Sequence, residues 1–288
     1  MPGFLPFASA LELPAYVCDN CGFWQRHFAE PPSCPVCLDA RHVPPQHAWR
    51  FRSDVEAEAD FPCLWDEIEP GIWRFWNDPV AGIGPSGYLL TTPDGNMLFE
   101  GCTVFSAAAL DHMAACGGVQ VLSASHPHSY GAIWQVQERF DPDLALPAAD
   151  LAWSAAFRVS WPYDDRLEPL PGLELHRTAG HFDGHAVLYD RARGILFCGD
   201  ALKFELDPAD PRRALTISTH KAFVRAIPLT PAELRRYREV FAGLDFGQTW
   251  TPFEQAANSG RAEALALIDT MLAGRPHAGP VRLDRLRR

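Results

Sequence analysis

Two apolar runs that end in polar loops constrain the fold of this chain more than any other feature. Residues 119–122 lead into a loop with two histidines one residue apart, and residues 195–197 lead into an aspartate. Short apolar runs bounded by loop residues are typical of buried strands. A third loop, residues 180–185, carries two more histidines. Together these loops carry histidines and an aspartate, which are side chains that can bind a metal ion. We expect them to line one cleft at one edge of a sheet sandwich.

Composition places the chain among globular proteins and argues against two classes of partner. The chain has 288 residues, 47% of them hydrophobic and 21% charged, with a formal net charge of −11. No basic face is visible, and the short basic tail is expected to be a solvated end, so we expect no nucleic-acid partner. No apolar run reaches the roughly 18 residues that span a bilayer, so we expect no membrane partner. Residues 1–14 lack the basic start of a signal peptide, which predicts mature sequence.

Four of the eight cysteines form two C-x-x-C pairs separated by twelve residues. Such pairs aim their sulfurs at one tetrahedral ion. The four predicted ligands are Cys18, Cys21, Cys34 and Cys37. This segment is similar to zinc ribbons and to the short rubredoxin-like domains of rubrerythrins. We therefore expect structural zinc, with iron as the alternative because four thiolates accept both. Reduced thiols without a signal peptide indicate the cytoplasm.

The rest of the sequence predicts alternating strands and helices. Asp94-Gly95 predicts a hairpin, and Gly117-Gly118 predicts the end of a helix over residues 106–116. Thr230 and Glu233 predict a capping box that begins another helix. Further helices are predicted over residues 132–139 and 261–272, and strands over residues 155–160, 174–178, 186–189 and 249–253. We expect a layered α/β domain over residues 51–288, preceded by the cysteine module in residues 1–50.

The hairpin, the three polar loops and their order resemble the metallo-β-lactamase fold superfamily over about residues 80 to 272. The resemblance implies an αββα sandwich with metals at the edge where its two sheets meet. It also implies that His126, His128, His181 and Asp200 surround the first metal ion. His185, the last residue of the second histidine loop, is expected to support the site without binding the ion.

The resemblance breaks at the second metal. Where the superfamily has an aspartate and a histidine in the first loop, this sequence has Tyr130 and Gly131. Where it has a histidine near the last strand, this sequence has Phe253. The second set of ligands is therefore missing, and we expect a single zinc or iron ion in the cleft. His220 and Glu254 are two candidates to replace a lost ligand.

The leading hypothesis is a metal-dependent hydrolase that acts on an ester, thioester, lactone or amide of a small molecule. Asp200 would be a ligand or a general base, Tyr130 a hydrogen-bond donor to an oxyanion, and His220 a further catalytic group. One alternative is a metal-binding scaffold without catalysis, since three ligands are lost. Another is a redox protein that uses iron in the cysteine module.

Overall fold

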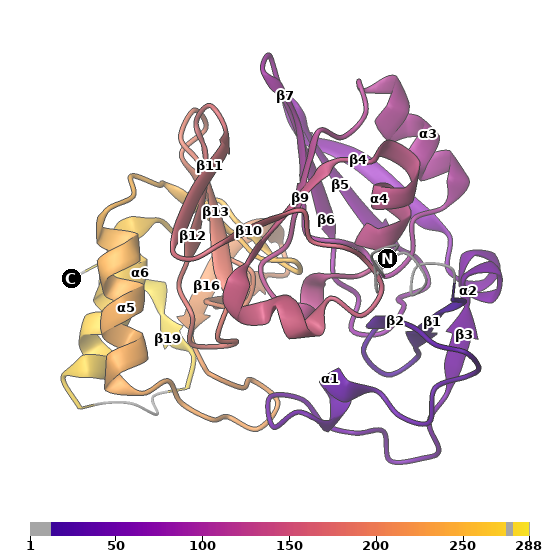
Figure 1. Cartoon of the computed structure of the whole chain (residues 1–288). Coiled ribbons are helices and arrows are strands. Elements are labelled where there is room, and N and C mark those ends of the chain that lie inside the picture. The colour runs from indigo at the N-terminus through magenta and orange to yellow at the C-terminus, as the bar shows by residue number, and fades with distance from the viewer. Residues whose placement is uncertain (1–12, 275–278, 288) are drawn as a thin grey trace, which may run out of the picture. The chain divides into compact units, whose positions relative to one another are not determined.

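A computed structural model describes residues 13–274 and 279–287 of the chain (Figure 1). The predicted mature N-terminus lies mainly in residues 1–12, outside the described residues. The structure divides into two compact units. Unit 1 runs to Leu146 and includes Leu151–Pro162, whereas unit 2 holds Pro147–Asp150 and the chain from Tyr163 onward. Within the described parts of the chain, every helix is too short or too polar to cross a membrane.

Unit 1 is built on a seven-stranded sheet with the order β10-β9-β8-β7-β6-β5-β4. Its strands are β4 (Cys63–Glu69), β5 (Ile72–Asn77), β6 (Gly87–Thr92), β7 (Gly95–Phe99), β8 (Val121–Ser123), β9 (Asp143–Pro147) and β10 (Trp161–Tyr163). The first four form an antiparallel meander, whereas β7, β8 and β9 are parallel. Thr92 pairs with Gly95 where β6 turns into β7, which confirms the hairpin predicted at Asp94-Gly95.

Three helices accompany this sheet: α2 (Asp54–Asp60), α3 (Ala107–Ala115) and α4 (Ile133–Phe140). Helix α3 connects β7 to β8 and α4 connects β8 to β9, as parallel neighbours require. The Ser106 side chain accepts a hydrogen bond from the Ala109 backbone N–H, so the helix predicted over residues 106–116 is confirmed with its cap. Buried residues of the two crossover helices belong to the same hydrophobic core as buried residues of β6 and β7.

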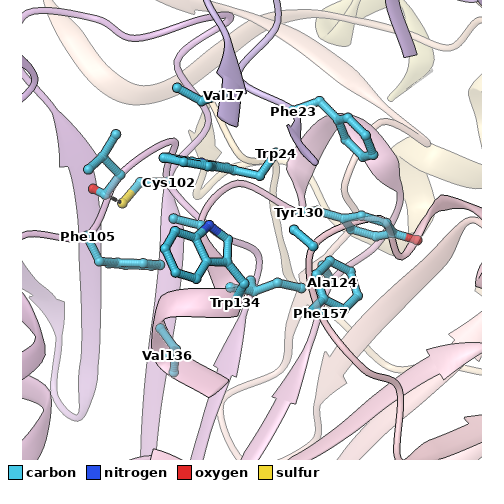
Figure 2. Close-up of a cluster of buried hydrophobic side chains, with 14 of the residues drawn as sticks. Val17, Phe23, Trp24, Cys102, Phe105, Ala124, Tyr130, Trp134, Val136 and Phe157 are labelled. Carbon is cyan, nitrogen blue, oxygen red and sulfur yellow. Dashed lines mark hydrogen bonds between the residues drawn. The ribbon is translucent and has the colours of Figure 1, made fainter. Parts of the chain in front are cut away.

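The cysteine module forms a small sheet with the order β2-β1-β3, from β1 (Ala15–Cys18), β2 (Trp24–Arg26) and β3 (Phe51–Ser53), together with α1 (Pro35–Leu38). Its core is continuous with that of the large sheet in unit 1. Figure 2 shows Trp24 against Trp134, whose ring centroids are 5.2 Å apart. The Trp24 indole also donates to the Thr103 carbonyl at 2.7 Å. A Cβ atom on Gly22 would lie 2.8 Å from Thr103 Oγ1, so glycine permits this close approach.

Unit 2 contains a six-stranded sheet with the order β11-β12-β13-β14-β17-β18 and a smaller sheet with the order β15-β16-β19. Their strands are β11 (Arg166–Leu170), β12 (Leu173–Arg177), β13 (Ala186–Asp190), β14 (Ile195–Phe197), β15 (Lys203–Asp207), β16 (Asp210–Ser218), β17 (Gln248–Trp250), β18 (Gln255–Ala256) and β19 (Val281–Arg282). The helices are α5 (Pro231–Ala242), α6 (Arg261–Leu272) and α7 (Leu283–Leu286). Helices α5 and α6 lie side by side (Figure 1). The predicted capping box at Thr230 and the predicted bounds of α6 are confirmed.

The strand predicted over residues 155–160 is wrong. In the structure these residues form a loop whose backbone bonds to other elements: Arg158 N–H donates to the Gln137 side chain and Ser160 N–H donates to the Leu144 carbonyl. The apolar residues that suggested a strand, Ala156 and Phe157, instead fill the core of unit 1 from this loop. The β15–β16 hairpin was not predicted, because its charged residues around Asp207 and Asp210 obscure the alternation of a strand.

Candidate metal sites

The four sulfurs of the cysteine module form one cluster within unit 1. Their Sγ atoms all lie within 4.8 Å of one another. Cys18 and Cys21 flank the turn after β1, and Cys34 and Cys37 lie at the start and within α1. All four side chains are buried. The cluster is therefore a zinc-ribbon-like module, with the ligand number and spacing that hold a tetrahedral ion.

The pKa values of the four thiols diverge, because these side chains are buried and close together. Hydrogen bonds from the other cysteines, Cys18 first, hold the pKa of Cys37 below its usual range. Burial instead raises the pKa of Cys21 well above its usual range. The Asn20 side chain donates to Cys37 Sγ at 3.3 Å. Four buried sulfurs at this spacing cannot all ionise unless a cation offsets their charge. A bound metal ion would supply that positive charge.

His126 and His128 both lie just beyond β8, at one end of the unit 1 sheet. Pro127–Ser129 form one short 3-10 turn, and the two imidazole centroids are 5.2 Å apart. Both rings are more than nine-tenths buried. Ser125 Oγ hydrogen-bonds to His126 Nδ1 at 2.7 Å, and the Ser125 N–H donates to Glu100 Oε2 at 2.9 Å. This chain of bonds fixes the His126 ring and points to Nε2 as its metal-binding atom.

His181 and Asp200 lie together within unit 2. Asp200 follows β14, and His181 lies in the loop between β12 and β13. Strands β12, β13 and β14 are successive neighbours in the sheet. His181 Nε2 is 3.5 Å from Asp200 Oδ2. The Lys221 carbonyl binds His181 Nδ1 at 2.6 Å, so this ring also presents Nε2 to the carboxylate side. Each unit thus contributes two of the four ligands predicted from the sequence.

His185 holds the loop that carries Asp200. Its Nδ1 hydrogen-bonds to Thr178 Oγ1 at 2.8 Å, and its Nε2 accepts the Asp200 backbone N–H at 3.2 Å. The side chain is fully buried. Because both ring nitrogens are used inside unit 2, His185 supports the position of Asp200 and does not offer a nitrogen to a metal ion.

Comparison with known proteins identifies the fold. The family model described as the metallo-beta-lactamase superfamily matches residues 110–236, which include all four predicted cleft ligands. The structure of DIM-1 metallo-beta-lactamase matches with a TM-score of 0.55 and 9% identity, over 73% of this chain and 99% of that one. The FIM-1 metallo-beta-lactamase of Pseudomonas aeruginosa, in its mono-zinc form, matches with a TM-score of 0.53 and 14% identity, over 76% and 97%. This chain has the metallo-β-lactamase fold.

A full-length relative gives no activity. The chain is 24% identical over 262 residues to YmaE, an uncharacterized protein of Bacillus subtilis (strain 168), which covers 88% of this chain and 93% of that protein. The metallo-β-lactamase fold itself supports many chemistries, so the function must come from the site.

Tyr130 and Gly131, the two first-loop residues predicted to stand in place of second-metal ligands, are both tightly packed. A Cβ atom on Gly131 would lie 2.1 Å from the Cys102 carbonyl oxygen and 2.4 Å from that of Gly101, and its φ is +45°. A histidine therefore does not fit here. Tyr130 is 2% exposed, and its ring lies 5.3 Å from that of Phe157 within the hydrophobic cluster of Figure 2. A packing role explains Tyr130, and its role toward an oxyanion stays a prediction.

The replacement candidates lie in unit 2. Phe253 is 38% exposed, and the next residue, Glu254, turns inward to accept a hydrogen bond from Thr251 Oγ1. Burial, with a smaller contribution from Asp200, raises the pKa of Glu254 to about 7. His220 packs against Phe223, with ring centroids 5.1 Å apart. Catalytic roles for Asp200 and His220 stay predictions.

Sequence reasoning missed the groups that orient the ligands. Ser125 directly precedes His126, so the sequence could have indicated that these two side chains interact. The Lys221 carbonyl is 40 residues from His181 and is a backbone atom, so no residue type signals it. His42 is not among the site residues predicted from the sequence, yet its ring centroid is 5.3 Å from that of His128.

Proposed function

We propose that this chain is a metal-dependent hydrolase in which His126, His128, His181 and Asp200 bind one zinc or iron ion together. Three imidazoles and one carboxylate are a donor set that both metals accept. The proposal rests above all on ligand anchoring: the Nδ1 atoms of His126 and His181 are each held by a hydrogen bond. Such bonds fix the tautomer and the ring orientation of metal-binding histidines.

The packing of the first loop supports a single metal ion in the cleft. The close packing of Gly131 leaves no space for a histidine, and Tyr130 is buried in the core. A clamp of two metals on attacking and leaving oxygens is thus not supplied by these residues. One bound ion would supply Lewis acidity toward a carbonyl and would make water more acidic. The substrate is proposed to be a small ester, thioester, lactone or amide.

The roles of the chain's own groups follow from their bonds. Asp200 is proposed as a ligand, because His185 fixes its backbone beside His181. Glu254 is proposed to hold a proton near neutral pH, because burial raises its pKa to about 7. We propose that the four cysteines bind a structural zinc or iron ion, and that the protein works in a reducing compartment such as the cytoplasm, because this requires reduced thiols.

Metal content tests the proposal directly. Purified protein should hold two ions per chain, and His128→Ala and Cys34→Ser should each remove one of them. His176→Ala is the matched control, because His176 is bonded to Glu174 in unit 2 and is not a predicted ligand. The proposal is supported if His128→Ala loses one ion and also loses hydrolysis of the substrates that wild type cleaves. The substrate panel contains thioesters, lactones, amides and p-nitrophenyl esters.

Two results would count against it. An unchanged metal content in His128→Ala would overturn the cleft site. A loaded cleft with no hydrolysis of any substrate class would favour the alternative of a scaffold without catalysis.

A further inference from the structure

His42 lies between the two metal-binding groups of unit 1. Its ring is 6% exposed and belongs to the cysteine module, five residues after Cys37. The ring packs edge-on against that of His128, with centroids 5.3 Å apart and planes at 66°. Its Nδ1 hydrogen-bonds to the Val43 carbonyl at 3.0 Å. One imidazole of the cysteine module therefore packs directly on a predicted ligand of the cleft.

The loop that carries His42 is fixed to the cysteine cluster. Asn20 Nδ2 donates both to Cys37 Sγ at 3.3 Å and to the Val43 carbonyl at 3.0 Å. The His42 N–H donates to the Asp39 carbonyl at 3.1 Å. Asn20 thus ties Cys37 to the carbonyl that binds His42 Nδ1, so an ion that holds Cys37 would also hold the His42 ring in place.

Two neighbouring histidine rings contact His128. Its ring packs edge-on against those of His126 and His42, with centroids 5.2 Å and 5.3 Å away. His126 has Ser125 as an anchor, and His181 has the Lys221 carbonyl. Supports of this kind around a metal ligand typically change metal affinity about 10-fold to 100-fold.

We propose that His42 is a positioning residue for His128, so that an ion in the cysteine cluster prepares the cleft to bind its own ion. The inference rests on the proposed function, because it needs His128 to be a metal ligand. Coupling between two sites is reciprocal, so an ion in the cleft should strengthen binding in the cysteine cluster by the same factor.

Two substitutions separate the contacts of His42. His42→Gln keeps a donor for the Val43 carbonyl but removes the ring, whereas His42→Phe keeps a ring and removes that donor. His47→Ala is the matched control, because His47 is an exposed histidine of the same segment. Cobalt titration monitors both sites in one sample, since thiolate ligands give charge-transfer bands and the cleft gives weaker visible bands. Thermal unfolding reports any general loss of stability.

The expected result is selective. His42→Gln should weaken cobalt binding in the cleft about 10-fold or more and shift the visible bands, with the thiolate bands retained. His42→Phe, which keeps a ring but loses the bond that holds it, should weaken the cleft less than His42→Gln does, and His47→Ala should stay near wild type. Cys34→Ser, which removes the cysteine-bound ion with His42 present, should also weaken the cleft.

Wild-type cleft affinity in both His42→Gln and Cys34→Ser would overturn the inference, and so would a stronger effect of His42→Phe than of His42→Gln. If His128→Ala leaves the metal content unchanged, the proposed function itself fails. If His128→Ala loses an ion while His42→Gln binds normally, only the role of His42 fails.

Discussion

Gly131 and Cys102 approach so closely that a Cβ atom on Gly131 would lie 2.1 Å from the Cys102 carbonyl oxygen. Gly131 also has a φ of +45°, a backbone conformation that favours glycine. The loop that bears His126 and His128 thus continues into a segment pressed against the backbone after β7. The packing of unit 1 thus leaves no space for a histidine at Gly131, the position where the sequence predicts that a second-metal ligand is missing.

Gly131→Ala is expected to destabilise the protein by at least about 3 kcal/mol, because it adds a steric clash to the strain of a positive φ. Gly172→Ala is the control, since Gly172 has a φ of +80° and nothing within 4 Å of its added Cβ. That control should cost only about 1 kcal/mol. Urea unfolding of both variants measures the difference, and equal costs would show that the clash is relieved easily.

Ser125→Ala is expected to lower the affinity of the cleft for zinc about 10-fold to 100-fold, because His126 would lose the hydrogen bond that holds its Nδ1. Competition with a chromophoric chelator measures the affinity. Ser154→Ala is the matched control, since the Ser154 hydroxyl bonds only locally to the Leu151 carbonyl. Equal affinities in the two variants would contradict the anchoring role of Ser125.

Cys34→Ser is expected to lower the free energy of unfolding by at least about 3 kcal/mol, because the cysteine cluster is part of the unit 1 core and a structural ion contributes to folding. A strong chelator should have the same effect on wild type and little further effect on this variant. Cys116→Ser, at the half-buried residue that directly follows α3, is the control. An unchanged unfolding midpoint after metal removal would show that unit 1 folds without its ion.

Glu254 should make stability depend on pH. Burial raises its pKa to about 7 in the folded protein, above the value of 4.5 expected when unfolded. The folded state therefore binds the proton more tightly, and the stabilising contribution is complete below about pH 4.5 and is lost as pH rises through about 7. Relative to Glu254→Gln, wild type should lose on the order of 2 kcal/mol between pH 5 and pH 8.

Denaturation of wild type and Glu254→Gln at several pH values measures this loss. Glu239→Gln, at a side chain that is 75% exposed, should run parallel to wild type. A constant difference between wild type and Glu254→Gln across the range would show that Glu254 titrates at its ordinary pKa.

Local signals explain what the sequence predicted well. The Gly117-Gly118 pair indicated the end of α3, the Thr230 cap indicated the start of α5, and the apolar run at residues 195–197 indicated β14, because such signals act over a few residues. The fold class followed from the order of these elements and from the polar loops at strand ends. The comparisons bear this out.

Long-range packing explains what the sequence did not predict. Phe157 fills the core of unit 1 from a loop, although its neighbours resemble a strand. His42 meets His128 across more than eighty residues of sequence, and no pattern near either residue indicates that contact. The space around Gly131 depends on the carbonyl of Cys102, which every residue type carries.

The indole of Trp24 bonds to Thr103 and packs on Trp134, although it belongs to the first folded segment of the chain. During synthesis on the ribosome this segment emerges before Trp134, with all four of its cysteines available to bind an ion. It cannot complete its hydrophobic contacts until translation has passed Trp134. We therefore expect the nascent chain to capture its first ion before the surrounding core exists, and a polypeptide truncated ahead of Trp134 to remain a substrate for proteases and chaperones.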